Sequence, residues 1–195
     1  AVLGLGNIGP AAALPVMEGK AVLFKRFADI DAWPVCLDTQ DVDEIVRTVQ
    51  LLAPVYGGIN LEDISAPRCF EIEVRLRELL DIPVFHDDQH GTAIVVLAAL
   101  RNSLRLVNKE LSDVKIVMSG AGAAGTAIAR LLVLGGAKNI VAFDLDGVIS
   151  KSSQGEDPMR RWFIENSNPD NFQGDIHQAM AGADVFIGVS APNVI

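Results

Sequence analysis

The chain has 195 residues, of which 50% are hydrophobic and 21% are charged, a composition typical of soluble globular proteins. Its formal net charge of −9 argues against nucleic acid and anionic membranes as main partners, because both select clustered Lys and Arg. Cys36 and Cys69 are the only cysteines and have no CxxC spacing, which argues against a disulfide framework and a zinc site. No apolar run approaches the ~20 residues that span a bilayer. We therefore expect a cytoplasmic protein without a membrane segment.

The first half of the chain alternates short apolar runs with helical patterns, which predicts an α/β unit. One helical pattern is especially clear, because Val42, Ile45, Val46 and Val49 fall on one face. The predicted strands cover 1–5, 21–24, 33–37, 55–60 and 83–85, and the predicted helices cover 41–52 and 68–80.

A long apolar helix over 92–106 is expected to lead into a second unit. That unit is predicted to contain strands over 115–118, 139–143 and 184–189, a helix that ends near 134, and a short helix after 174. The polar stretch 151–174 has no predicted element. This alternation of strands and helices indicates a doubly wound parallel sheet.

Two segments match the GxGxxG pattern, 4–9 and 120–125, and their surroundings differ. The second lies between a predicted strand and a predicted helix, and the next strand leads to Asp144, 22 residues beyond Gly122. Small residues let the backbone approach a pyrophosphate, and the helix N-terminus offers free N–H groups. We interpret the first segment as a tight turn and not as a second cofactor site. The predicted dinucleotide site consists of Gly120, Ala121, Gly122, Ala123, Ala124, Gly125 and Asp144, with Asn193 a further candidate on the nicotinamide side.

The residues after Asp144 bear on the choice of nucleotide. Leu145 and Asp146 follow it, and the next cation along the chain is Lys151. A 2′-phosphate would therefore face carboxylates with no neighbouring cation. The sequence favours NAD over NADP, unless a cation arrives from elsewhere in the fold.

Two pairs of adjacent carboxylates, Glu62-Asp63 and Asp87-Asp88, each follow a predicted strand. Adjacent carboxylates repel, and Mg²⁺ and Mn²⁺ prefer oxygen ligands, so these pairs are candidates for a metal site. Solvated acidic loops on an acidic protein explain the spacing about equally well. Lys20 stands beside an apolar run, where a partly buried lysine can act as a general base, although position alone favours a surface lysine.

The segments AVLGLGNIGP, PVMEGKAVLF, NLEDI, FHDDQHGTA, SGAGAAG and FDLDGVI occur in this order along the chain. In these motifs the chain resembles malic enzyme in its compact prokaryotic, NAD(P)-dependent, decarboxylating form. The resemblance covers essentially the whole chain. It implies oxidation of L-malate to pyruvate and CO₂ with NAD(P)⁺ and Mg²⁺ or Mn²⁺, by a homodimer or a higher homo-oligomer.

The resemblance also implies roles for individual residues. Glu62, Asp63 and Asp88 match the metal ligands of the family, Lys20 matches its catalytic lysine, and Asp87 matches the carboxylate that pairs with this lysine. The glycines of 120–125 and Asp144 match nucleotide-binding positions. The expected fold is a substrate- and metal-binding α/β unit over 1–91, followed by a Rossmann-like doubly wound domain over 92–195.

The chain departs from the family pattern in one catalytic group. The proton-donating tyrosine of the family lies upstream of the GLGNIG segment, and the single tyrosine here, Tyr56, does not match that position. We therefore expect a chain that is truncated at both ends, with the catalytic tyrosine outside it. Two other functions remain open: a malolactic enzyme that converts malate to lactate, and a nucleotide-binding module without catalysis.

Overall fold

The computed structural model describes residues 5–155 and 157–190. The chain divides into two compact units, Ala1–His86 and Asp87–Ile195. Each unit contains its own clusters of buried hydrophobic residues, so each is described by itself. Among the described residues, no helix is long and apolar enough to cross a membrane.

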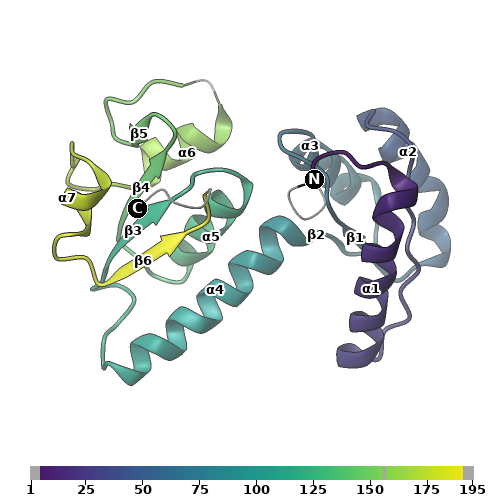
Figure 1. Cartoon of the computed structure of the whole chain (residues 1–195), viewed down its shortest axis with the longest axis horizontal. Helices are drawn as coiled ribbons and strands as arrows, with labels where there is room; N and C mark the ends of the chain where they lie inside the picture. The colour runs from purple at the N-terminus through teal and green to yellow at the C-terminus, as the bar shows by residue number, and fades with distance from the viewer. Residues whose placement is uncertain (1–4, 156, 191–195) are drawn as a thin grey trace. The chain divides into compact units, whose positions relative to one another are not determined.

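The first unit combines helices with a small parallel sheet (Figure 1). The two strands, β1 (Ile59–Leu61) and β2 (Val84–His86), are paired so that Leu61 lies opposite His86. The helical segments are α1 (Pro10–Ala28), α2 (Val42–Leu52), the 3-10 helix η2 (Ala53–Val55) and α3 (Arg68–Leu79).

The core of the first unit lies between α2, α3 and the sheet. Its buried residues are Ile45, Val46 and Val49 of α2, Ile72 and Leu76 of α3, and Leu61 and Val84 of the strands. The helix α2 begins after Asp41, whose side chain accepts a hydrogen bond from the backbone N–H of Glu44 at 2.9 Å. This cap satisfies a donor that the first turn leaves without a partner. By contrast, α1 buries none of its residues.

The second unit contains a sheet with the strand order β5-β4-β3-β6 (Figure 1). β3 (Lys115–Ser119) pairs in parallel with β4 (Asn139–Asp144) and β6 (Val185–Gly188), whereas β5 (Gly147–Val148) is antiparallel to β4. The helices are α4 (Asp87–Leu106), α5 (Ala123–Leu134), α6 (Pro158–Asn166) and α7 (Ile176–Met180).

The order of the strands reverses at β3. The chain passes from β3 through α5 to β4 on one side, and later returns through α7 to β6 on the other side. The carboxyl end of β3 is therefore the topological switch point, where doubly wound sheets bind their ligands. The predicted Rossmann-like arrangement is confirmed.

Alternate residues of the strands face two different layers, because successive side chains of a strand point to opposite faces. Ile116 and Met118 pack with residues of α4, α5 and α6, among them Ile128. Val117 and Val141 pack instead with Ala179 and its neighbours in α7. Helices thus cover both faces of the sheet, which leaves its carboxyl edge as the place for a site.

Two predicted strands of the first unit are wrong. The segment 21–24 lies inside α1, so Lys20 is on a helix and not at the end of a strand, and 33–37 contains no strand. Runs of four or five apolar residues are too short for periodicity to separate strand from helix. Pro10 at the first helical position, where a missing N–H costs nothing, favours the start of the helix. Of the predicted strand 55–60, only the end is part of β1.

The second unit differs from prediction in three places, the first being the short strand β5, for which no element was predicted. The helix predicted from 92 begins at Asp87, because two carboxylates in its first turn interact favourably with the helix dipole. The stretch without a predicted element contains α6, which Asp157 caps by accepting a hydrogen bond from the Arg160 backbone N–H at 3.1 Å. The other predicted helices and strands of this unit, and the helices predicted over 41–52 and 68–80, are confirmed within one or two residues.

Candidate active site

The glycine segment 120–125 forms a tight loop between β3 and α5, and each glycine has a different environment. Gly120 adopts φ 110°, and a Cβ there would lie 2.9 Å from the backbone of Val189. A Cβ at Gly125 would collide with the carbonyl oxygen of Gly120. At Gly122 nothing lies within 4 Å, so the backbone is open to a ligand. These are the three tasks that a dinucleotide loop requires: a sharp turn, a close approach to the pyrophosphate, and tight helix–strand packing.

The N-terminus of α5 supplies an electrostatic reason for an anion to bind at this loop. The helix has 12 residues, and its N-cap, Gly122, makes no side-chain cap hydrogen bond. Ala123 and Ala124 begin the helix with side chains too small to cover its first N–H groups. These donors and the positive end of the helix dipole favour a negatively charged group, such as a pyrophosphate.

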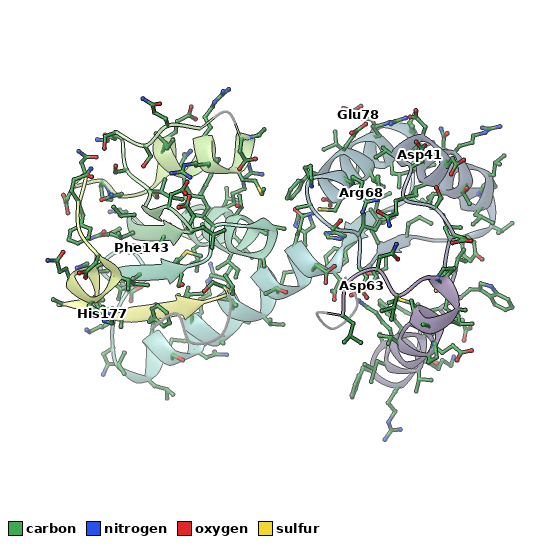
Figure 2. The ribbon with its side chains drawn as sticks, turned by 45° about the horizontal axis from the view of Figure 1, so that its top comes forward. Asp41, Asp63, Arg68, Glu78, Phe143 and His177 are labelled. Atoms are coloured by element: carbon green, nitrogen blue, oxygen red, sulfur yellow. The ribbon has the colours of Figure 1, made fainter. Side chains whose placement is uncertain are left out.

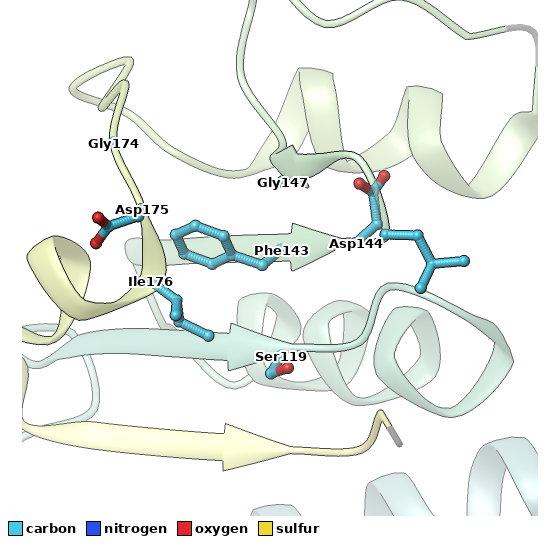
Figure 3. Close-up of a pocket in the computed structure, with 8 residues that line it drawn as sticks. Ser119, Phe143, Asp144, Gly147, Gly174, Asp175 and Ile176 are labelled. Atoms are coloured by element: carbon cyan, nitrogen blue, oxygen red, sulfur yellow. The ribbon is translucent and has the colours of Figure 1, made fainter. Parts of the chain in front are cut away.

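A pocket of about 240 Å³ opens at the carboxyl ends of β3 and β4 (Figure 3). Phe143 and Ile176 form its apolar wall, and Ser119 and Asp144 contribute polar atoms. The remaining lining residues are Leu145, Gly147, Gly174 and Asp175. The pocket therefore lies at the switch point and contains the predicted ribose-binding acid.

A cation does reach Asp144 from elsewhere in the fold, which is the exception that the preference for NAD had left open. The Arg160 guanidinium reaches in from α6, with its Nη1 2.8 Å from Asp144 Oδ2 and 2.6 Å from Asp146 Oδ2. The Asp144 and Arg160 side chains are each about 20% exposed. A cation from a distant element of the fold thus stands at the edge of the pocket, and sequence reasoning missed it.

In the first unit, the structure brings Lys20 of α1 together with Glu62, the residue after β1. Lys20 Nζ donates to Glu62 Oε2, and the Asn60 side-chain N–H donates to the same oxygen at 3.1 Å. The Lys20 and Glu62 side chains are 22% and 17% exposed. This partial burial excludes the alternative of a freely solvated surface lysine.

The predicted carboxylates follow the carboxyl ends of β1 and β2. Asp63, labelled in Figure 2, follows Glu62 with φ 54° in the left-handed region, which short polar side chains tolerate. Asp87 and Asp88 occupy the first turn of α4 and not a loop. Gly91 leaves room for the Asp87 side chain, because a Cβ there would collide with Asp87 Oδ1.

The predicted metal ligands are distributed over both units, with Glu62 and Asp63 in the first and Asp88 in the second. Within either unit, residues 5–155 and 157–190 contain no group of three or more His, Cys, Asp or Glu side chains that could hold a metal ion. Asn193 lies outside the described residues.

Two family models match the chain, one to each part. Residues 1–77 match the model described as malic enzyme, N-terminal domain, and residues 89–193 match malic enzyme, NAD binding domain. Over its whole length the chain is 58% identical to the NAD-dependent malic enzyme of Geobacillus stearothermophilus, and 55% identical to the bifunctional malic/malolactic enzyme of Bacillus subtilis. It spans 41% and 48% of the lengths of these two relatives.

A solved structure gives the same result. The NAD-dependent malic enzyme of Thermotoga maritima is similar at a TM-score of 0.94 and 51% identity, over 100% of this chain and 52% of that one. The similarity thus includes both units and the glycine segment 120–125. The chain therefore belongs to the malic enzyme family.

Proposed function

We propose that the full-length protein oxidatively decarboxylates L-malate to pyruvate and CO₂ with reduction of NAD(P)⁺. The observation that carries this proposal is the glycine loop at the switch point of a malic enzyme chain, next to a pocket that Asp144 lines. The chain spans about half of its relatives or less, so the activity belongs to the longer protein. The proposed partner is the small molecule L-malate, and the proposed assembly is a homodimer or a higher homo-oligomer, which light scattering of the full-length protein would test.

Glu62, Asp63 and Asp88 are the proposed ligands of Mg²⁺ or Mn²⁺. Their carboxylate oxygens suit a hard divalent cation. The amide oxygen of Asn60, beside Glu62, is buried and has no hydrogen-bond partner among the described residues, so it is available to a cation or to its bound water. When bound, such a cation would make the malate hydroxyl more acidic and stabilise negative charge on its oxygen.

Lys20 is the proposed general base, because its Nζ lies beside a proposed metal ligand and is partly buried. In this role Lys20 Nζ accepts the proton of the C2 hydroxyl, while the hydride of C2 leaves for the nicotinamide. Asp87 is the proposed partner that stabilises the protonated lysine. The parallel pairing of Leu61 with His86 supports this assignment, since Glu62 and Asp87 are the residues that directly follow these two strand ends.

The test of the reaction is an assay of the full-length protein with L-malate, NAD⁺ and Mn²⁺. We expect NADH to accumulate together with pyruvate. A malolactic enzyme would form lactate without releasing NADH, and this alternative has a specific basis in the bifunctional Bacillus subtilis relative. Nucleotide binding without any turnover of malate would contradict both reactions and favour the non-catalytic module.

The test of the base is Lys20→Ala, with Lys25→Ala on the same helix as the matched control. Lys25 is 54% exposed and pairs with Asp29 and Asp31, so its loss should leave the activity unchanged. Lys20→Ala should lower kcat by about 10²-fold or more, the range of a lost general base, with the Kd for NAD⁺ unchanged. A loss of nucleotide binding would show that Lys20 serves the nucleotide and not the hydroxyl proton.

The test of the metal site is Asp88→Asn, with the exposed Asp170→Asn as the control. Loss of one charged ligand should weaken Mn²⁺ binding by about tenfold or more, because a neutral amide holds a hard divalent cation less tightly than a carboxylate does. Calorimetric titration of the full-length protein with Mn²⁺ measures this directly. Unchanged Mn²⁺ affinity would contradict the assignment of Asp88 as a ligand.

A further inference from the structure

The contact between Arg160 and Asp144 is not used by any step proposed above. Arg160 lies in the first turn of α6, 16 residues beyond the acid at the end of β4, and its Nη1 contacts both Asp144 and Asp146. Its backbone N–H is also fixed, since it donates to the N-cap Asp157 at 3.1 Å. Contacts within the second unit thus hold the guanidinium beside the proposed ribose-binding acid.

Two neighbouring features hold this arrangement in place. Asp144 Oδ1 accepts a hydrogen bond from the Asp146 backbone N–H at 2.9 Å, so both oxygens of Asp144 are engaged within the protein. The Arg160 side chain runs over Gly155, where a Cβ would lie 2.7 Å from Arg160 Cδ. A larger residue at Gly155 would therefore displace the arginine from the two carboxylates.

The charges around Arg160 determine what it can bind. One guanidinium faces two carboxylates, so the group as a whole carries a net negative charge. Its Nε is buried and has no hydrogen-bond partner among the described residues, which leaves donor capacity unused. Asp146 is 73% exposed, and it competes for the same Nη1 that a phosphate would approach. A dianionic 2′-phosphate is thus opposed here because the nearby cation is already shared between two anions.

We propose that Arg160 and Asp146 together determine which adenine nucleotide the protein accepts. With Asp146 in place, Arg160 orients the Asp144 carboxylate toward the ribose hydroxyls of NAD and is withheld from a 2′-phosphate. Without the Asp146 charge, the same guanidinium becomes a bidentate donor for that phosphate. This inference rests on the proposed function, since it takes the pocket at Asp144 to be the nucleotide site.

The test uses the full-length protein and two probes that differ only in one group, ADP-ribose and 2′-phospho-ADP-ribose, with Kd values from calorimetry. Asp146→Asn should strengthen binding of the phosphorylated probe by about tenfold, since a freed charged hydrogen bond contributes about that much. Its Kd for ADP-ribose should change by less than about twofold, because Asp144 keeps its partner. NAD⁺ and NADP⁺ should follow the same order.

The double variant Asp146→Asn/Arg160→Met decides whether the gain comes from Arg160. This double variant should bind the phosphorylated probe no more tightly than the parent does. Asp146→Asn/Arg160→Lys should keep part of the increased affinity, because lysine retains the positive charge but cannot form a bidentate contact. Arg161→Met, at the exposed next position of α6, should bind both probes like the parent. Circular dichroism and the unfolding midpoint establish that each variant is folded.

Two results would overturn the proposal: no gain for the phosphorylated probe in Asp146→Asn, or a gain that survives in the double variant with Arg160→Met. A parent protein that binds neither probe has a different meaning. It would contradict the nucleotide site in the proposed function, and with it the premise that Asp144 faces a ribose.

Discussion

Asp184 joins the starts of two neighbouring strands in the second unit. Its Oδ2 accepts the Lys115 backbone N–H at 2.8 Å, and its own backbone N–H donates to the Lys115 carbonyl at 3.0 Å. Its Oδ1 is paired with the Lys109 ammonium. The Lys109 ammonium and the Lys115 N–H hold the pKa of the Asp184 carboxyl below its usual range, because both stabilise the charged form.

The lowered pKa of Asp184 predicts how its contribution to stability depends on pH. The charged form is stabilised in the folded state, so the contribution is present above the unfolded-state pKa and is lost as the pH falls through the folded-state pKa. Asp184→Asn should therefore lower the urea midpoint at neutral pH, and the difference from the parent should shrink toward about pH 3. The exposed Asp113→Asn provides the control. A difference independent of pH would show that packing, and not charge, explains the effect.

At the scale of elements, two glycines at the start of α5 have opposite tasks, Gly125 in its first turn and Gly122 at its N-cap. Gly125 lies against the Gly120 carbonyl, where a Cβ has no room, and Gly122 lies in open space. An alanine inside the helix gains at most about 1 kcal/mol in helix propensity. Overpacking costs about 1–3 kcal/mol or more where the neighbour is backbone and cannot rotate away. At Gly125 the steric cost of a methyl group therefore outweighs its gain in helix propensity.

The matched pair Gly125→Ala and Gly122→Ala separates stability from binding. Gly125→Ala should destabilise the second unit by about 1–3 kcal/mol, because the helix must move away from the loop. Gly122→Ala should leave the unfolding midpoint nearly unchanged and weaken NAD⁺ binding, because its methyl group meets the proposed pyrophosphate position. Thermal unfolding and calorimetric titration with NAD⁺ measure the two effects. Normal NAD⁺ affinity in Gly122→Ala would contradict the placement of the nucleotide.

At the scale of the whole molecule, each unit has its own buried side chains. Ile72 on α3 and Ile128 on α5 are both fully buried, the first in the core of Ala1–His86 and the second in that of Asp87–Ile195. Both are isoleucines on helices that pack against parallel strands. They therefore form a matched pair for measuring the stability of each unit.

Ile72→Ala and Ile128→Ala should each cost about 2–5 kcal/mol, because a large buried side chain is lost and a cavity remains. Hydrogen exchange measured by mass spectrometry on the full-length protein should show weakened protection mainly in the unit that carries each change. The exposed Ile94→Ala on α4 serves as the control. Equal loss of protection in both units from either variant would mean that they unfold as one.

Local patterns predicted some elements well and failed at others. The strand β3, the glycine loop and α5 were all predictable, because their signals are adjacent in the sequence and agree with one another. The helix α1 was not, since 21–24 has an apolar run without a helical period and Pro15 lies inside the helix. The helix α6 was missed although Asp157-Pro158 is a helix start signal, because the polar residues around it form no apolar stripe.

The nucleotide site shows the same difference between local and long-range signals. The family could be recognised from the sequence alone, and the glycine turn between β3 and α5 could be predicted, because its signals are neighbours along the chain. The nucleotide-binding roles of this turn and of Asp144 stay predictions. The contacts of Arg160 with Asp144 and of Lys20 with Glu62 are visible only in the folded chain. Both contacts join residues of different elements, and their pairing depends on how the helices pack onto the sheets. Such long-range electrostatic contacts leave no periodic signal in the sequence, because a single charged residue has the same local pattern whether or not it finds a partner.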